Sequence, residues 1–232
     1  QERIFVVVNP TLDEHVALDR AIITAKLLSP SPTICAFVAI DPDTVDSDVS
    51  NDKISRNTDW FEEQIHAPLR AAGLEYKIEV SWCNNWQKAI MRSAEKFGAT
   101  RILIRAGKPK TPSRFSFAES KWKLLKGATC PVLIVRDGAA EQRKVVLAAV
   151  NFQASRDHQQ QLNANILARG RALAESYDAE FHVANAYIDS MHYPDRGRLA
   201  KETGLDSKHI HVVQGYTDEA IAKMTSSTPS LH

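Results

Sequence analysis

The sequence predicts an α/β fold in which parallel strands alternate with helices, and it predicts two such units within 232 residues. Two observations support the parallel sheet. The predicted strands are short, continuous apolar runs, which are typical of strands buried on both faces, and stretches with helical periodicity separate them. A third observation supports the repeat, because the apolar run that opens the chain at 3–8 recurs at 145–150.

The first copy contains five predicted strands with helices between them. Continuous or alternating apolar runs predict strands at 3–8, 34–40, 76–82, 101–105 and 132–135. Apolar side chains at a spacing of three or four predict helices at 17–28, 60–72, 87–97 and around 122–125. Asp13 is a candidate N-terminal cap of the first helix. Alternating strands and helices of this kind imply right-handed crossovers in a parallel sheet.

Three features predict local irregularity in the first copy. Pro68 lies inside the apolar stripe of the second helix and must bend or interrupt it, because proline has no amide hydrogen to donate. Gly73 follows and is expected to end that helix. The segment 41–51 is rich in aspartate and has no apolar period, so we expect a solvated loop there.

The second copy repeats the first with fewer elements. We expect strands at 145–150, 181–188 and around 211–213, a helix with an apolar stripe over 162–174, and a helix at 219–224. The last two strands are missing, and a sheet without them would expose a long edge, so we expect this copy to be incomplete in the given sequence. Residues 136–142 form the predicted linker. The expected domains are therefore 1–136 and 143–232.

Composition and charge exclude several classes of protein. The chain is 44% hydrophobic and carries 29 basic and 28 acidic side chains, so it has no overall attraction for nucleic acid or for an anionic membrane. No apolar run is long enough to span a bilayer, and no signal peptide is recognised. The three cysteines, Cys35, Cys83 and Cys130, are too few and too scattered for a disulfide framework. We therefore expect a cytoplasmic protein.

Three stretches carry a resemblance to a known family. They are the strand that ends in Asn9-Pro10-Thr11, the start of the helix from Gly215 to Met224, and the segment 128–135, Ala-Thr-Cys-Pro-Val-Leu-Ile-Val. The last segment looks like the closing strand A-x-C-P-V-L-V-V of universal stress proteins. The segment 122–125 and the paired copies further resemble the E-type tandem members of bacteria. The resemblance covers essentially the whole chain.

The resemblance implies a specific architecture. Each copy would be a Rossmann-like domain of the adenine-nucleotide-hydrolase type, with a five-stranded parallel sheet and helices on both faces. The two domains would pack as a pseudo-dimer within one chain, and a homodimer stays open. The function implied is that of a cytoplasmic stress-response protein with protein partners, without a membrane and without nucleic acid.

Many universal stress proteins bind ATP, and the resemblance implies which residues would do so here. In those proteins an Asp at the end of the first strand contacts the adenine. A loop with Gly-x-x-Gly, then nine residues, then Gly and Ser or Thr, surrounds the phosphates with backbone amides. The first copy has Asn9 at the Asp position, and it departs from the loop pattern at Arg105, Lys108, Ala118 and Glu119. We therefore expect no ATP in the first domain.

In the second copy, the candidate cofactor-binding residues are Asn151, at the Asp position, and Tyr187. The amide of Asn151 can still reach an edge of adenine, so ATP or another adenine nucleotide is expected in the second domain only. Two alternatives stay open. One is a binder of a non-nucleotide, lipid-like small molecule, or an interaction scaffold. The other is a slow ATPase, although no hydrolase or kinase signature supports an enzyme and no catalytic residue is assigned.

Three further features have both a functional and a structural interpretation. The segment 105–126 is basic and aromatic, as in a single-strand nucleic-acid surface, but a solvated loop is the simpler interpretation. Cys83 lies at a strand-to-helix turn, and without a base to activate it we expect a packing role. Four histidines could suggest a metal, but we expect surface side chains and no metal, because no carboxylate or cysteine partner is evident. They are His182, His192, His209 and His211.

Overall fold

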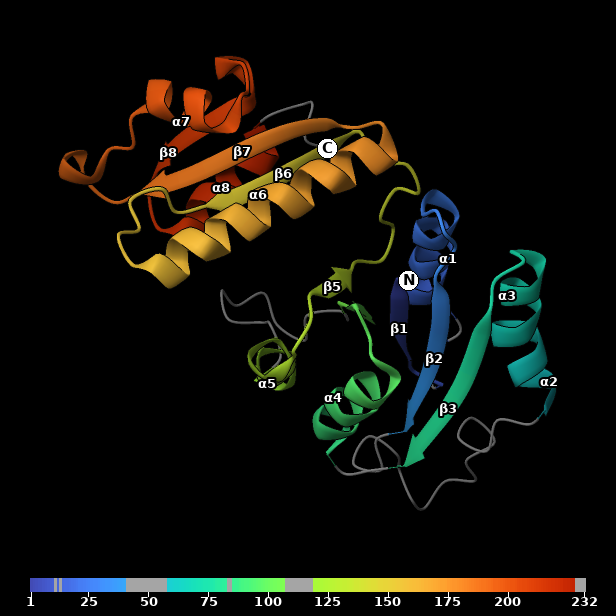
Figure 1. Cartoon of the computed structure of the whole chain (residues 1–232). Coiled ribbons are helices and arrows are strands. Elements are labelled where there is room, and N and C mark those ends of the chain that lie inside the picture. The colour runs from blue at the N-terminus through green and yellow to red at the C-terminus, as the bar shows by residue number, and fades with distance from the viewer. Residues whose placement is uncertain (11, 13, 41–57, 83–84, 107–118, 228–232) are drawn as a thin grey trace. The chain divides into compact units, whose positions relative to one another are not determined.

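The computed structural model describes residues 1–232 except 11, 13, 41–57, 83–84, 107–118 and 228–232 (Figure 1). The chain forms two compact units, Gln1–Glu141 and Gln142–His232. Each unit contains its own parallel sheet. Across these described ranges, no helix has the length and apolarity needed to cross a membrane.

The first unit is built on a five-stranded sheet in the order β3-β2-β1-β4-β5. The strands are β1 (Arg3–Val8), β2 (Thr33–Ile40), β3 (Tyr76–Trp82), β4 (Arg101–Arg105) and β5 (Val132–Val135). All neighbouring pairs are parallel. The predicted α/β class and the five-stranded parallel sheet are therefore confirmed for this unit, and each strand bound agrees with the sequence prediction to within one residue.

Helices cover both faces of this sheet, because successive strand side chains point to opposite sides (Figure 1). Ile4 and Val6 of β1 pack in the core shared with α1 (Val16–Leu27) and α3 (Ala67–Ala71). Phe5, between them, packs in the opposite core with α4 (Trp86–Phe97) and α5 (Glu119–Gly127). A strand that is buried on both faces needs apolar side chains at every position, which is why β1 is a continuous apolar run.

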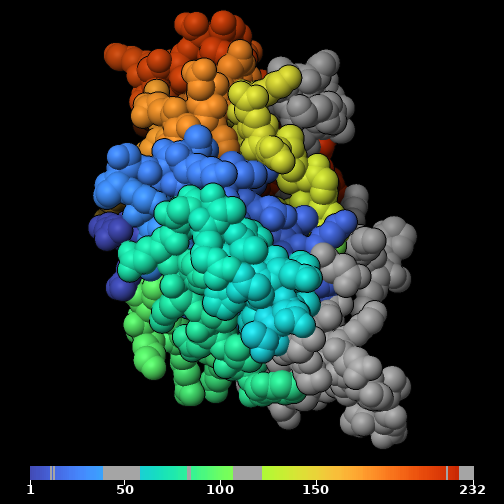
Figure 2. Space-filling view, turned by 90° about the vertical axis from the view of Figure 1, so that its right-hand side faces the viewer, coloured from blue at the N-terminus to red at the C-terminus, as the bar shows by residue number. Residues whose placement is uncertain are grey.

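Pro68 interrupts its helix as predicted. The helix α2 (Thr58–Phe61) runs into a π-helical turn, Glu62–His66, and then into α3, whose first turn contains Pro68. The Ala67 amide donates to the carbonyl of Glu62, five residues earlier, and this wider turn accommodates a proline that cannot donate. Gly73 follows α3 at a φ of 65°, which glycine adopts without strain. Figure 2 shows the segment from α2 to β3, in cyan and teal, on the surface of the first unit.

Several sequence predictions are corrected or lie outside the described residues. The N-cap of α1 is His15, so the prediction of Asp13 as the cap is wrong, and Asp13 itself is not among the described residues. Also outside them are Thr11, the acidic loop 41–51, Cys83, the basic stretch 107–118 with Lys108 and Ala118, and the side chain of Glu119.

The second unit has a three-stranded parallel sheet, β6-β7-β8, within its described range. The strands are β6 (Val145–Val150), β7 (Glu180–Tyr187) and β8 (Ile210–Gln214). The helices are α6 (Asp157–Tyr177), α7 (Arg196–Thr203) and α8 (Thr217–Ser227). Figure 1 shows the long helix α6 along one face of the sheet and α8 behind it. The neighbour order β6-β7-β8 is the same as that of β1-β2-β3 in the first unit.

The core of the second unit is small and closely packed. It centres on Ala148, Ala174, Phe181 and Val183, from β6, α6 and β7. Helix α6 approaches the sheet closely at Gly170, where a Cβ would lie 2.8 Å from the Phe181 ring. This close approach packs α6 directly against β7 at Phe181 and against β6 at Ala148.

Candidate functional site

The carboxyl ends of β6, β7 and β8 bring polar side chains to one edge of the second sheet. Asn151 directly follows β6, and Tyr187 is the last residue of β7, so both sequence-predicted residues lie at this edge on neighbouring strands. Tyr187 pairs with Gln214 at the end of β8. Open parallel sheets bind ligands in the crevice outside the carboxyl ends of their strands.

Asn151 is held in place through its backbone. Asn163 of α6 donates from Nδ2 to the carbonyl of Asn151 at 2.7 Å and accepts the Asn151 amide at its Oδ1 at 3.1 Å. The side-chain Oδ1 of Asn151 accepts the amide of Gln153 at 3.1 Å. Asn151 is exposed, and none of the described residues accepts a hydrogen bond from its Nδ2. This NH₂ group is therefore a hydrogen-bond donor available to a ligand.

A buried amide, that of Asn185, fixes the loop after β6. Asn185 is 1% exposed. Its Oδ1 accepts the Phe152 amide at 2.7 Å, and its Nδ2 donates to Gln153 Oε1 and to the Ala186 carbonyl, both at 2.9 Å. Gln153 Nε2 in turn donates to the carbonyl of His192 at 2.8 Å. Asn185 is not among the residues predicted from the sequence, although a lone amide in the apolar run of β7 is a signal that could have found it.

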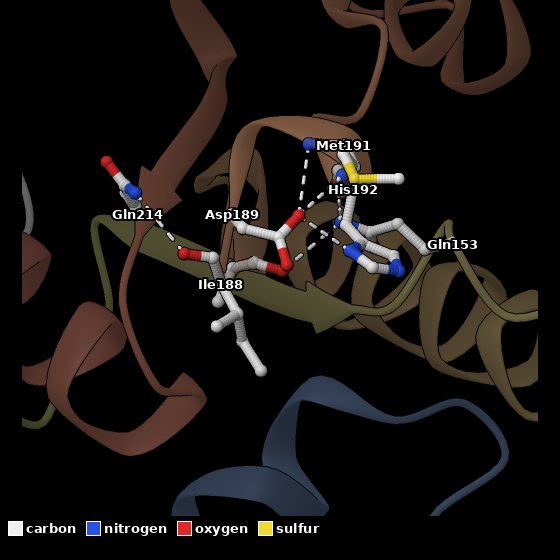
Figure 3. Close-up of polar contacts among 7 residues, drawn as sticks. Gln153, Ile188, Asp189, Met191, His192 and Gln214 are labelled. Atoms are coloured by element: carbon white, nitrogen blue, oxygen red, sulfur yellow. Dashed lines mark hydrogen bonds and ion pairs between the residues drawn. The ribbon is translucent and has the colours of Figure 1, made fainter.

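The turn after β7 is held by a carboxylate (Figure 3). Asp189 Oδ1 accepts the amides of Met191 and His192 at 3.0 and 3.1 Å, and it lies 2.7 Å from His192 Nδ1. The hydrogen bond from His192 lowers the pKa of the Asp189 carboxyl group. Gln214 Nε2 of β8 donates to the Ile188 carbonyl at 3.2 Å. His192 is exposed, as the sequence analysis expected, and it serves to hold this turn.

Aromatic rings lie beside this polar edge. The Tyr187 and Tyr193 rings meet edge to face, with centroids 5.2 Å apart and an interplanar angle of 84°. Tyr193 and Tyr216 are exposed, and so are the apolar side chains of Ile188 and Met191. Exposed aromatic faces next to hydrogen-bonding groups are suited to planar ligands, because any nucleobase can stack on a ring.

An ion pair occupies the corresponding edge of the first unit. The strand order reverses between β1 and β4, which is where open sheets bind ligands. Arg105, the last residue of β4, donates from Nε and from a terminal nitrogen to the two carboxylate oxygens of Asp137, each at 2.6 Å. These hydrogen bonds raise the pKa of Arg105. Its guanidinium is therefore satisfied by a neighbouring carboxylate.

Three histidines and a glutamate gather at the opposite, amino end of the second sheet. His182 of β7 is 4% exposed; its Nδ1 lies 2.8 Å from His211 Nε2, and its Nε2 lies 3.1 Å from Glu180 Oε2. The His209 ring meets the His182 ring edge-on, with centroids 4.7 Å apart. The hydrogen bond from His182 lowers the pKa of Glu180, and burial, followed by the charge of His182, lowers that of His211.

These positions correct the expectation of four surface histidines. That expectation is wrong for His182, which is buried. The carboxylate that the sequence analysis did not find is Glu180, two residues before His182 and on the same side of β7, because strand side chains alternate with a period of two.

Comparison with known proteins identifies related chains. The protein-family sequence model described as "Universal stress protein family" matches residues 1–136. The "Universal stress protein E homolog" of Haemophilus influenzae is 22% identical over 96% of this chain and 83% of its own length. Universal stress protein E of Escherichia coli K12 is 26% identical, over 95% of this chain and 79% of its own length.

Solved structures share the fold. A functionally unknown protein of Pseudomonas aeruginosa PAO1 superposes with a TM-score of 0.77 at 20% identity, covering 97% of this chain and 78% of its own. A universal stress protein of Archaeoglobus fulgidus superposes with a TM-score of 0.68 at 12% identity, covering 97% of this chain and 81% of its own.

Proposed function

Since the chain belongs to the universal stress protein family, we propose that it is a tandem, E-type member that binds an adenine nucleotide in its second domain only. The domains would be 1–136 and 143–232. The strand order shared by β6-β7-β8 and β1-β2-β3 supports a second copy of the same domain. The names of the curated relatives support a role in stress response, which we place in the cytoplasm.

The observation that carries the nucleotide proposal is the side chain of Asn151. Its Oδ1 is used by the Gln153 amide, which leaves the Nδ2 group to donate outward. Adenine presents ring nitrogens that accept such a hydrogen bond. Asn163 fixes the Asn151 backbone, and the Gln153 amide holds its Oδ1, so the Nδ2 donor is oriented before a ligand arrives and less binding energy is lost in ordering it.

The ring pair of Tyr187 and Tyr193 supports the same ligand class. Tyr187 is partly buried against Tyr193, and Tyr193 is exposed. Stacking of a base on an aromatic side chain contributes about 1–3 kcal/mol. An adenine that accepts a hydrogen bond from Asn151 and stacks on one of these rings would use both the donor and the aromatic surface at the carboxyl edge.

The restriction to the second domain is supported by Arg105. A phosphate loop requires glycine where the backbone approaches the phosphate groups closely. In the first domain, the first of these positions is Arg105, whose guanidinium is bound at two atoms by Asp137. A side chain held in this way fills space that the phosphates would need, and its charge is already compensated.

The test is calorimetric titration of the chain with adenosine and with AMP, ligands whose base contact does not depend on a phosphate loop. We expect one site per chain. Asn151→Ala should weaken binding about tenfold, which corresponds to about 1.4 kcal/mol and is the size of one hydrogen bond. The matched control is Asn9→Ala, at the equivalent position of the first domain, and it should leave the affinity unchanged.

Three other outcomes would redirect the proposal. Equal losses in Asn151→Ala and Asn9→Ala would contradict binding in the second domain only. Release of a lipid-like molecule from the denatured protein, in place of a nucleotide, would favour the non-nucleotide alternative. Steady phosphate release from ATP that Asn151→Ala abolishes would favour the ATPase.

A further inference from the structure

Glu180, His182 and His209 bring three metal-ligating groups together at the amino end of the second sheet. Their ligand atoms all lie within 4.8 Å of one another. Around a tetrahedral zinc ion with Zn–N bonds of about 2.0–2.1 Å, neighbouring ligand atoms lie roughly 3.4 Å apart. Glu180 Oε2 and His182 Nε2 are already 3.1 Å apart. We propose that these three side chains bind one divalent transition-metal ion of the zinc type, with water completing its coordination.

The backbone ladder brings the three side chains together. Glu180 and His182 stand on the same side of β7, two residues apart. Strand β8 pairs with β7 so that Ile210 lies opposite Val183, which places His209, the residue before β8, level with His182. The proximity of the three side chains therefore depends on strand register as well as on side-chain torsions. Register is strongly specified in a sheet with a buried face.

His211 has a positioning role in this arrangement. Its ring lies parallel to that of His182, at an interplanar angle of 10°, and its Nε2 is 2.8 Å from His182 Nδ1. With a metal ion on Nε2 of His182, the Nδ1 of that ring keeps its proton and donates to His211 Nε2. Metal-bound histidines generally use their second ring nitrogen in this way, which fixes both the tautomer and the ring orientation.

The burial of the ligands indicates how the ion reaches the site. The His182 side chain is 5% exposed, whereas that of Glu180 is 62% exposed. The site is therefore closed on the imidazole side and open to solvent at the carboxylate. Two imidazoles and one carboxylate form a donor set that zinc uses with an open position. Lys208 interacts electrostatically with Glu180, and Arg196 with His211. The positive charges of both side chains oppose the binding of a cation. We therefore expect weaker binding than at a closed four-ligand site.

The test is calorimetric titration of the purified chain with zinc chloride. We expect one ion per chain, and at least a tenfold loss of affinity in Glu180→Gln and in His209→Gln. His211→Gln should lose about tenfold, the lower end of the range for residues that orient a ligand. The matched control is His192→Gln, an exposed histidine with a carboxylate at 2.7 Å but outside the cluster, and it should bind zinc like the wild type.

Two further measurements separate metal binding from simple packing. Zinc should raise the unfolding temperature of the wild type and not that of Glu180→Gln, because only a native state that binds the ion is stabilised by it. Glu180 is exposed, so its variant should keep the wild-type circular dichroism spectrum even if the buried His182 does not tolerate change. With cobalt in place of zinc, the absorption spectrum should show no thiolate-to-metal charge-transfer band, because none of the proposed ligands is a cysteine.

The proposal is overturned by any of four results. They are no zinc binding, binding that survives both Glu180→Gln and His209→Gln, an equal loss in His192→Gln, and a thiolate charge-transfer band. The site is separate from the carboxyl edge, since the five residue steps along β7 from His182 to Tyr187 span about 17 Å. Its failure would therefore leave the nucleotide proposal untouched.

Discussion

Replacing Asn185 with alanine tests whether the buried amide network supports the carboxyl edge of the second unit. The variant removes the acceptor of the Phe152 amide and the donor to Gln153 Oε1 and to the Ala186 carbonyl. An unsatisfied buried donor costs about 1–3 kcal/mol, and each further lost hydrogen bond costs about 1 kcal/mol. Gln153 is only partly buried and can turn toward water, so its loss is smaller. We expect Asn185→Ala to lower the unfolding free energy of the second unit by about 2–4 kcal/mol.

The chain offers an internal reference for this measurement. All four tryptophans, Trp60, Trp82, Trp86 and Trp122, belong to the first unit, so tryptophan fluorescence during urea unfolding follows that unit alone. Far-UV circular dichroism follows both units. Asn185→Ala should therefore move a dichroism transition to lower urea concentration and leave the fluorescence transition in place.

The control for Asn185→Ala is Asn165→Ala on the exposed side of α6. Asn165 accepts one hydrogen bond at 3.3 Å, from Gln161, and its replacement should change stability by less than about 0.5 kcal/mol. A loss below about 1 kcal/mol in Asn185→Ala would refute the reasoning, because it would mean that the Phe152 amide finds another partner. A fluorescence transition that moves as far as the dichroism transition would show that the two units unfold together.

Two further predictions concern packing. Gly170→Ala places a Cβ 2.8 Å from the Phe181 ring, so we expect a loss of about 1–3 kcal/mol in the dichroism transition of the second unit; an unchanged midpoint would contradict the close approach of α6. Burial raises the pKa of Cys35 to about 11, so iodoacetamide at pH 8 should label the partly exposed Cys130 before Cys35, and Cys35 only on unfolding, as peptide mass spectrometry would show. Because the folded state holds the Cys35 proton more tightly, the linked stability is full below pH 9 and is lost as the pH rises toward 11. Labelling of Cys35 and Cys130 at the same rate would refute this burial.

The secondary structure of the first unit could be predicted closely from the sequence. The runs at 3–8, 76–82, 101–105 and 132–135 form strands with these same bounds. The continuous apolar runs are informative because a strand buried on both faces cannot hold polar side chains in its interior. The run at 76–82 instead alternates apolar and polar residues, which is the pattern of a strand with one exposed face. Helix starts were harder to predict. The N-cap of α1 is His15, whose side chain makes no capping bond, so composition carries no signal at this position.

The candidate sites could be predicted only in part. Asn151 and Tyr187 could be placed at the carboxyl edge, since a residue that ends a parallel strand lies there whatever its partners are. Asn163 and Asn185 were missed because their hydrogen bonds depend on the path of the loop after β6. The Glu-x-His pattern at 180–182 is visible in the sequence, but an alternating pair offers only two ligands.

The sequence by itself determined the family, the alternation of strands and helices, the parallel sheet of the first unit and the polar end of each strand. Only the tertiary structure decided that Asn163 clamps Asn151, that Arg105 pairs with Asp137 and that His209 meets His182. The physical reason is the range of the interactions. Propensity and apolar periodicity act between neighbours along the chain, whereas these hydrogen bonds and ring contacts join residues far apart in sequence. Their geometry follows from strand register and loop path, which depend on the packed sheet as a whole.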